Sequence, residues 1–507
     1  MAAAQDIANR TPITAALMLA TLMNTLDTTI ANVALPHIQG SVSASQDEIV
    51  WVLTSYIVAT AVMLPLTGWL SEKFGRKRVL MVSIAGFTAA SMLCGLASSL
   101  PELVAFRVLQ GIAGASLMPL SQTVLLDVYP PRLIPRVMSL WSAATMLGPI
   151  LGPTLGGWLT ENLSWRWVFF INLPVGALAF FLLFTFMARD AGGRQRPFDF
   201  LGFWALVALV GSVQLMLDRG PGQDWFDSPE IWAWAVTALI GFYVFVLQTA
   251  TAEHPFFDRN LARDRNFVTT TILSCFVFGL MFSTTALLPS FMQNLMSYSA
   301  LQSGIATVPR GFGSLIAFLA LPRLIVWFGG RNVLFAGIPL TLVAVWQMSQ
   351  FDLSMDVRPV MVACFIQGMG VGMLFAPLSM LAYATLDARY RPEGATIAAI
   401  MRSLGGSIGI SIIQAVLVRD SALAHERLAE GVTTANPVIR AALPLLMDPA
   451  TQTGLEALNA EVTRQGTMIG YANIFSWMTL SIVLFSPLVL LIRPARAPQT
   501  EVEPPVE

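Results

Sequence analysis

Apolar runs of about 20 residues recur along this chain from near residue 13 to near residue 492, each long enough for a helix to cross a bilayer core. Only 12% of the residues are charged, whereas a soluble globular chain carries about 25%. The chain is therefore predicted to be an all-α polytopic membrane protein. Its fourteen expected spans lie near residues 13–36, 49–71, 79–99, 102–126, 135–160, 166–187, 199–217, 230–250, 267–293, 303–327, 332–350, 358–383, 393–418 and 470–492.

The basic residues predict how these spans are oriented. Lys and Arg are absent from the first, third and ninth loops. They gather in even-numbered loops and in the tail, at Lys73, Arg76, Lys77, Arg78, Arg132, Arg136, Arg189, Arg194, Arg196, Arg259, Arg263, Arg265, Arg389, Arg391, Arg493 and Arg496. Because loops rich in Lys and Arg stay in the cytoplasm, both termini are expected to face the cytoplasm.

The two halves of the chain repeat each other weakly but in a constant order. S-A-S-Q-D-E-I at 43–49 returns as S-A-L-Q-S-G-I at 299–305, and Q-G at 110–111 returns at 367–368. Pro36, P-L-S at 119–121, Leu126-Asp127 and the glycine motif at 147–152 have counterparts at Pro289, 377–379, Leu386-Asp387 and 404–409. Two related bundles flanking a central path are typical of transporters that rock around a midplane site.

The repeat also predicts the domain organisation. We expect an N-terminal six-helix bundle over 1–187 and two inserted spans with their linkers over 188–266. A C-terminal six-helix bundle over 267–492 includes a long outer loop at 419–469, and a cytoplasmic tail follows at 493–507.

Asp27 lies within the stretch LDTTIANVALP, inside the first predicted span. An ionised acid there costs about 2.5–3.5 kcal/mol on insertion scales. Arg107 is placed at a similar depth in span 4, and the repeat aligns the two charges with Leu280 and Cys364. Since the second bundle forms the same helices without either charge, a role in proton or substrate handling is favoured. A purely structural ion pair is the alternative.

Several motifs resemble the major facilitator superfamily: G-W-L-S-E-K-F-G-R-K-R at 68–78, L-V-A-F-R-V-L-Q-G at 103–111 and L-G-P-I-L-G-P-T-L-G-G at 147–157. The opening stretch and W-R-W-V-F-F-I-N-L-P-V-G at 165–176 are similar to the fourteen-span drug:proton antiporters of that superfamily. The long last outer loop resembles EmrB-like permease subunits of tripartite efflux pumps. The resemblance implies the major facilitator fold, with two six-helix bundles and two inserted helices.

The first motif implies a cytoplasmic gate made by Gly68, Glu72, Gly75, Arg76, Lys77 and Asp127. Arg76 is expected to pair with Asp127, and Glu72 to face the positive N-terminal end of a helix in the other bundle. The family usually has Asp at the position of Glu72. A simple topology signal would explain Lys77 and Arg78, but not the glycines or the acid.

The span 5 motif contains Gly148, Pro149, Gly152, Pro153, Gly156 and Gly157. Small residues at helical spacing let helices pack closely in lipid, and each proline removes a backbone donor and is expected to bend the span. Ordinary helix packing explains part of this pattern. The repeat keeps Gly405 and Gly409 but has Gly406 in place of Pro149, so the proline is private to the first half.

Two further arginines fall inside predicted spans. Arg310 and Arg402 have no acid partner evident from the sequence. Two roles are expected for them: hydrogen bonds to carbonyl groups or cavity water, or binding of the substrate. With Asp27, Arg107 and Gln110, they complete the expected site for proton coupling and substrate.

Nothing in the sequence predicts an enzyme or a cofactor. No G-x-x-x-x-G-K-[ST] loop is present for ATP, and His37, His254 and His425 lie without metal-ligand spacing. In the outer loop, Leu455 and Leu458 recur with Val462 at helical spacing. This pattern predicts a surface helix on the membrane or over the outer mouth, or else a docking platform for another protein.

Together these features predict an inner-membrane antiporter that exports lipophilic small molecules against a proton gradient. An EmrA-like periplasmic adaptor and an outer-membrane channel are its expected partners, and nucleic acid is not. A symporter or uniporter for a metabolite is the alternative among transporters. A sensor or assembly protein that keeps the transporter fold is the alternative from another class.

Overall fold

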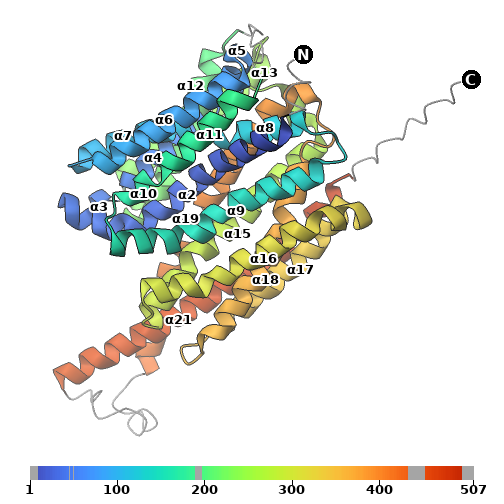
Figure 1. The fold of residues 1–507 in the computed structure, drawn as a ribbon. Coiled ribbons are helices and arrows are strands. Elements are labelled where there is room, and N and C mark those ends of the chain that lie inside the picture. The colour runs from blue at the N-terminus through green and yellow to red at the C-terminus, as the bar shows by residue number, and fades with distance from the viewer. Residues whose placement is uncertain (1–8, 45, 50, 189–196, 432–450, 494–507) are drawn as a thin grey trace, which may run out of the picture.

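The computed structural model describes residues 9–44, 46–49, 51–188, 197–431 and 451–493, and the regular elements in these ranges are all helices (Figure 1). The predicted tail beyond Arg493 and several basic residues (Arg189, Arg194, Arg196 and Arg496) lie outside the described residues. The first bundle comprises α2 (Arg10–Val42), α3 (Gln46–Ile49), α4 (Trp51–Met63), α5 (Leu66–Phe74), α6 (Arg76–Leu96), α7 (Leu100–Gly114), α8 (Leu117–Val128), α9 (Ile134–Asn162), α10 (Trp167–Phe170) and α11 (Asn172–Phe186).

The inserted pair and the second bundle follow in the chain. The pair is α12 (Phe200–Arg219) and α13 (Pro229–Thr251), and α14 (Arg259–Arg263) leads from it into the second bundle. That bundle comprises α15 (Arg265–Leu295), α16 (Ala300–Phe328), α17 (Gly330–Met348), α18 (Val357–Leu381), α19 (Arg391–Gly431) and α21 (Gln452–Phe485).

Twelve helical segments in the described residues are long and apolar enough to cross a membrane. The pair α4 and α5, bent by 55°, would be a thirteenth span. The remaining predicted span coincides with α9, which has 29 residues but is not among the sufficiently apolar segments. Its many Gly, Pro, Ser and Thr residues explain this, and it packs against α2 of the first bundle and α16 of the second.

The same helix pairs pack together in both bundles. The contacts of α2 with α9, of α4 with α7 and of α6 with α7 recur as contacts of α15 with α19, of α16 with α18 and of α17 with α18. Figure 1 shows the two bundles side by side, the first in blue to green and the second in yellow to red. The fold is thus all-α, with two six-span bundles and two inserted helices.

The bundles contact each other along α9, which packs on α16 and α18, and also at one end of the molecule. There α5 and α8 of the first bundle contact α19 of the second. We call the end at which α5 ends and α19 begins the gate end. Arg10 donates to the carbonyl of Val128 at the end of α8, so the start of α2 lies at the gate end as well.

The long outer loop differs from its prediction. Leu455, Leu458 and Val462 belong to α21, which runs without a break from Gln452 to Phe485, so the expectation of a separate surface helix is wrong. α19 extends to Gly431, and the two helices pack as a hairpin, the α19/α21 hairpin, with the His425 ring 3.1 Å from Asn459. Two long helices that pair with each other need no membrane surface to lie on. Residues 432–450 lie outside the described part of this loop.

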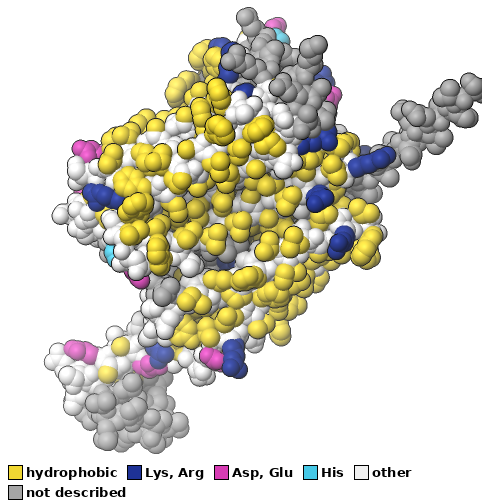
Figure 2. Space-filling model, viewed as in Figure 1, with side chains coloured by type: hydrophobic (Ala, Val, Ile, Leu, Met, Phe, Trp, Pro, Cys, Tyr) yellow, Lys and Arg dark blue, Asp and Glu magenta, His cyan; other side chains and the backbone are white. Residues whose placement is uncertain are grey.

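The surface has the character of a lipid-facing protein. Figure 2 shows hydrophobic side chains over the middle of the visible face, with Lys, Arg, Asp and Glu mostly towards its edges. Large apolar side chains such as Val82, Phe200, Trp327 and Leu484 are exposed. Because such a wide apolar surface needs an apolar solvent, the chain is a multi-span membrane protein.

Candidate functional site

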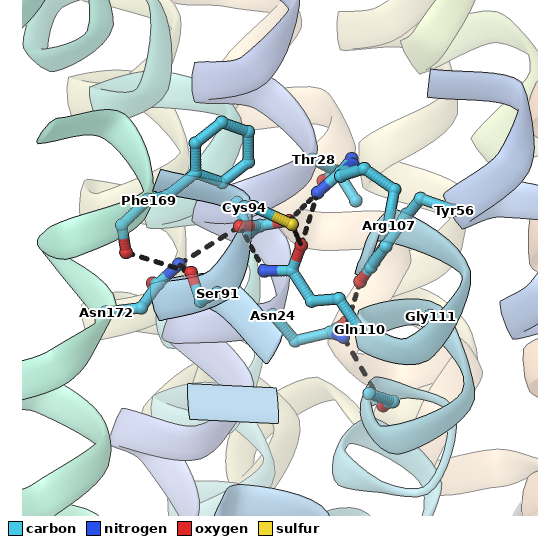
Figure 3. A network of polar contacts seen from close by, with 12 residues as sticks. Asn24, Thr28, Tyr56, Ser91, Cys94, Arg107, Gln110, Gly111, Phe169 and Asn172 are labelled. Atoms are coloured by element: carbon cyan, nitrogen blue, oxygen red, sulfur yellow. Dashed lines mark hydrogen bonds and ion pairs between the residues drawn. The ribbon is translucent and has the colours of Figure 1, made fainter. Parts of the chain in front are cut away.

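Asp27 and Arg107 form an ion pair in the interior of the first bundle. An Arg107 Nη1–Asp27 Oδ2 distance of 2.6 Å joins α7 to α2, and the Asp27 side chain is 1% exposed. The carboxylate also accepts hydrogen bonds from Gln110 Nε2 at 2.8 Å and Asn172 Nδ2 at 3.0 Å (Figure 3). Asp27 therefore accepts from three side-chain donors on α7 and α11, as an ionised carboxylate does.

The rest of the Arg107 guanidinium contacts residues of α4, α7 and α10. Its Nε donates to the carbonyl of Val52 at 2.9 Å, and Nη1 also donates to Gln110 Oε1 at 2.8 Å. The guanidinium lies 4.3 Å from the ring centre of Tyr56 and 5.7 Å from that of Phe169. Its Nη2 has no hydrogen-bond partner among the described residues. Nε and Nη1 of Arg107 are thus fixed by hydrogen bonds, and Nη2 remains able to donate to another acceptor.

Sequence reasoning missed the outer members of this network. Asn172 opens α11 and donates to Ser91 Oγ at 2.9 Å as well as to Asp27, and Ser91 donates to the carbonyl of Phe169. Asn24, one turn before Asp27 on α2, donates to the Tyr56 hydroxyl at 3.0 Å. Asn172 does lie in the quoted stretch at 165–176, and a polar residue inside an apolar run is the signal that marks it.

The span 5 glycines position the helix that carries Asp27. A methyl group on Gly148 would lie 2.6 Å from the Thr25 carbonyl carbon, and one on Gly152 would lie 2.7 Å from Thr29 Cβ. Thr29 Oγ1 donates to the Gly148 carbonyl at 3.0 Å. The backbones of α9 and α2 therefore touch on both sides of Asp27 along α2, which a larger side chain would prevent.

The remaining motif residues are less constrained. A methyl group on Gly157 would meet nothing within 4 Å among the described residues, and α9 continues through Pro149. Gly156 accepts a hydrogen bond from Thr160, and the side chain of Pro153 lies outside the described atoms. Gly405 and Gly409 pack against α15 in the same way, so close packing at this motif belongs to both bundles.

Asp127 links three segments at the gate end. It pairs with Arg76 at the start of α6, which places these two residues in contact as predicted. That pair lies within the first bundle, however. An ion pair that does link the two bundles is made by Arg391 of α19, whose Nη1 lies 3.3 Å from Asp127 Oδ1. Sequence reasoning counted Arg391 only among the basic loop residues.

The other gate residues lie around the first turn of α19. Glu72 lines a surface pocket together with Gly68 and Glu393. Glu393 Oε2 accepts the backbone N–H of Asp258 at 2.9 Å, which ties the linker after α13 to this turn. Gly75 has a φ of 85°, a conformation that favours glycine. A methyl group on Gly68 would be in ordinary contact with Glu393 at 3.8 Å, so close approach does not demand a glycine there.

Lys77 serves the first bundle itself. Its ammonium donates to the carbonyl of Phe184 at 2.9 Å and to that of Met187, at the C-terminal end of α11. A buried cation at the negative end of a helix is stabilising. Lys77 is therefore more than a topology signal, whereas Arg78 is exposed.

Arg310 and Arg402 lie apart from the Asp27 network, in the second bundle. Arg310 donates to Thr285 Oγ1 at 2.7 Å and lies 4.0 Å from the Cys364 sulfur. Arg402 is buried beside the Phe278 ring at 5.8 Å, and its Nε and Nη2 have no hydrogen-bond partner within the described ranges. Among the described residues neither arginine forms an ion pair. No group of three metal-ligating side chains occurs in the described part of the chain.

Comparisons with known proteins agree with this architecture. The family model described as Major Facilitator Superfamily matches residues 17–410. The fatty acid resistance protein FarB of Neisseria gonorrhoeae is 34% identical over 489 residues, covering 95% of this chain and 96% of FarB. The multidrug export protein EmrB of Escherichia coli strain K12 is 35% identical over 475 residues, covering 93% of each chain. The crystal structure of the human organic anion transporter MFSD10 aligns with a TM-score of 0.58 at 15% identity, covering 95% of this chain and all of MFSD10, so that likeness concerns the fold alone.

Proposed function

Because this chain belongs to the major facilitator superfamily and is a transporter, not an enzyme, we propose that it is a proton-driven multidrug antiporter. It exports lipophilic small molecules by alternating access, in exchange for protons. The support is a single observation: a buried carboxylate, Asp27, whose counter-charge and other donors come from neighbouring helices.

The Asp27 network has two competing states. We assign the conformation described to the first state, in which an ionised carboxylate pairs with Arg107. A proton that binds Asp27 cancels the carboxylate charge and leaves the Arg107 guanidinium without a counter-ion. A buried unpaired charge is strongly unfavourable, so Arg107 then moves to water, to another acceptor or to an acidic substrate. Proton binding and ion pairing exclude each other, which is the requirement for coupling.

The contacts between bundles suit the outward-facing half of such a cycle. The gate end is bridged by Asp127 and Arg391 and by the packing of α5 and α8 on α19. We place this end in the cytoplasm, together with both termini, because the basic loops gather there. Arg310 and Arg402 complete the proposed substrate path in the second bundle. Each has at least one buried donor atom that no described residue accepts from.

We further propose that the chain is the inner-membrane component of a tripartite pump. The α19/α21 hairpin extends from the end opposite the gate, where a periplasmic adaptor would dock. EmrB and FarB are named for multidrug export and fatty acid resistance, respectively. Photo-crosslinking from Leu455, which is exposed on this hairpin, tests the partnership. Capture of no adaptor in cells that express one would contradict it.

The decisive experiment uses purified protein in proteoliposomes with an imposed pH gradient. We expect dye export in the wild type and its loss, by at least about tenfold, in Asp27→Asn. That variant leaves Arg107 buried without a counter-charge, which lowers the stability of the fold by about 3–5 kcal/mol. Folding is therefore checked by size-exclusion chromatography. Glu102→Gln, which changes an exposed acid on α7, is the matched control and should export normally.

The double variant Asp27→Asn/Arg107→Gln separates coupling from structure. It removes both charges, so it should fold better than the single variant and still not couple export to protons. Restored proton-coupled export would show that the pair is structural. Proton-driven uptake of a metabolite by the wild type would favour a symporter instead.

A further inference from the structure

A second acid lies at the far end of the inserted helix α12. Asp218 is one turn before Gly222, and its Oδ2 is buried without a hydrogen-bond partner in the described part of the chain. It belongs to neither half of the internal repeat, since α12 lies between them. The proposed function makes no use of it.

Asp218 is paired with a fully buried amide. Gln214 Nε2 donates to Asp218 Oδ1 at 3.1 Å and to Ser407 Oγ of α19 at 2.7 Å. Gln214 is 0% exposed, and none of the residues that the structure describes hydrogen-bonds to its Oε1. Two oxygens of one side-chain pair are therefore buried and unused. Both accept hydrogen bonds when Asp218 is ionised, so neither can satisfy the other.

No cation among the described residues balances an ionised Asp218. Arg219, the next residue, pairs with Glu230 of α13 at 3.0 Å and lies over the Trp51 ring. The neighbouring helix α4 places the Thr54 hydroxyl near the Asp218 carboxyl. α4 contains no charged residue, and its Tyr56 hydroxyl accepts a hydrogen bond from Asn24.

α19 and the loop after α12 add no counter-charge either. α19 has no charged residue between Arg402, which lies beside Phe278, and Arg419. The loop contributes only further acids, Asp224 and Asp227. An uncompensated carboxylate in such a site is costly.

We propose that Asp218 and Gln214 form a second proton-binding site. One proton added to the Asp218 carboxylate turns Oδ2 into a donor, and Gln214 Oε1 is the acceptor available to it. Together with the existing Nε2–Oδ1 bond, this closes a two-bond pair between acid and amide. A single proton thus satisfies both unused oxygens and removes the buried charge.

This site lies at the seam between the bundles, and its coupling role rests on the proposed function. α12 packs against α4 of the first bundle and α19 of the second. Ser407 binds Gln214, and Ser411 donates to the Leu217 carbonyl at 2.6 Å. Loss of the proton leaves Gln214 Oε1 facing a carboxylate, which weakens the hold of α12 on α19. Protonation here therefore favours the arrangement of the bundles described above.

Infrared titration of the purified full-length protein tests the site directly. The wild type should show the carbonyl stretch of a protonated carboxylic acid that disappears as the pH rises. Asp218→Asn should lack this band, while Asp27→Asn and Asp227→Asn, an exposed acid of the following loop, should keep it. Gln214→Leu keeps the acid but removes its acceptor, so its band should move in frequency. An unchanged band in Asp218→Asn would overturn the proposal.

Proteoliposome export tests the coupling role. In Asp218→Asn the external pH for half-maximal export should shift by about one unit or more, whereas Asp227→Asn should match the wild type. An unshifted profile would overturn the coupling role even if the band is lost. A wild type without proton-coupled export would instead refute the proposed function, and the infrared band would still decide whether Asp218 binds a proton.

Discussion

At the scale of residues, the two halves of the chain place side chains of different polarity at equivalent positions. Asp27 aligns with Leu280, and Arg107 with Cys364, and both apolar counterparts are buried. In the second bundle Gln367, the counterpart of Gln110, donates to Thr284 at 2.9 Å and needs no acid. The charges of the first bundle are therefore additions to a helix arrangement that is stable without them.

Lys77→Met tests a residue whose role the structure redefined. The change removes the donor to the C-terminal carbonyls of α11, so we expect a loss of about 1–2 kcal/mol in stability. A lower melting temperature in detergent would show this. Arg78→Met removes an exposed charge from the same basic run and should melt like the wild type. Equal melting temperatures for all three proteins would mean that Lys77 serves only topology.

At the scale of elements, the contact of α9 with α2 is the one that most affects the site. Gly148 and Gly152 lie against Thr25 and Thr29, which flank Asp27 on α2. The polar contacts of Asp27 depend on where α2 lies between α7, α9 and α11. Small residues in α9 thus control the geometry of a site to which they contribute no side chain.

Gly148→Ala should disturb that geometry. Its methyl group would lie 2.6 Å from the Thr25 backbone, and overpacking of this kind costs about 1–3 kcal/mol. We expect a lower melting temperature and weaker dye export. Gly157→Ala, in the same motif but facing open space, should be tolerated. If the two variants melt and export alike, close packing at Gly148 is not what the motif provides.

At the scale of the whole molecule, an ion pair at the gate end connects the two bundles. Asp127 connects Arg76 of its own bundle with Arg391 of the other, and these side chains remain partly exposed. Exposed pairs contribute little, about 0–1 kcal/mol. A weak link of this kind suits a gate that must open in every cycle.

Arg391→Gln should therefore shift the gate without unfolding the protein. Losing an ion pair that stabilises the closed gate by up to about 1 kcal/mol lowers the ratio of closed to open gate by up to about fivefold. Spin labels on the gate ends of α8 and α19 would report this as a larger population at long distance. Arg389→Gln, which removes the local pair with Asp387 and the contact with the neighbouring Tyr390 ring, is the control. Identical distance distributions for both variants would exclude a gating role for Arg391.

Sequence and structure contributed different parts of this description. The approximate positions of the spans, the internal repeat and the contacts Asp27–Arg107 and Arg76–Asp127 follow from hydropathy, motif order and charge, because water and lipid act on each segment separately. Hydropathy alone does not fix the number of spans, since fourteen are predicted and twelve or thirteen described segments are apolar enough to cross a membrane. Tertiary structure alone decided that Asn172 and Tyr56 face the Asp27 network, that Arg391 completes the gate and that Gln214 accompanies Asp218. The physical reason is that lipid and protein interior are both apolar, so hydropathy does not show which face of a membrane helix meets its neighbours. Only the packed helices define those faces.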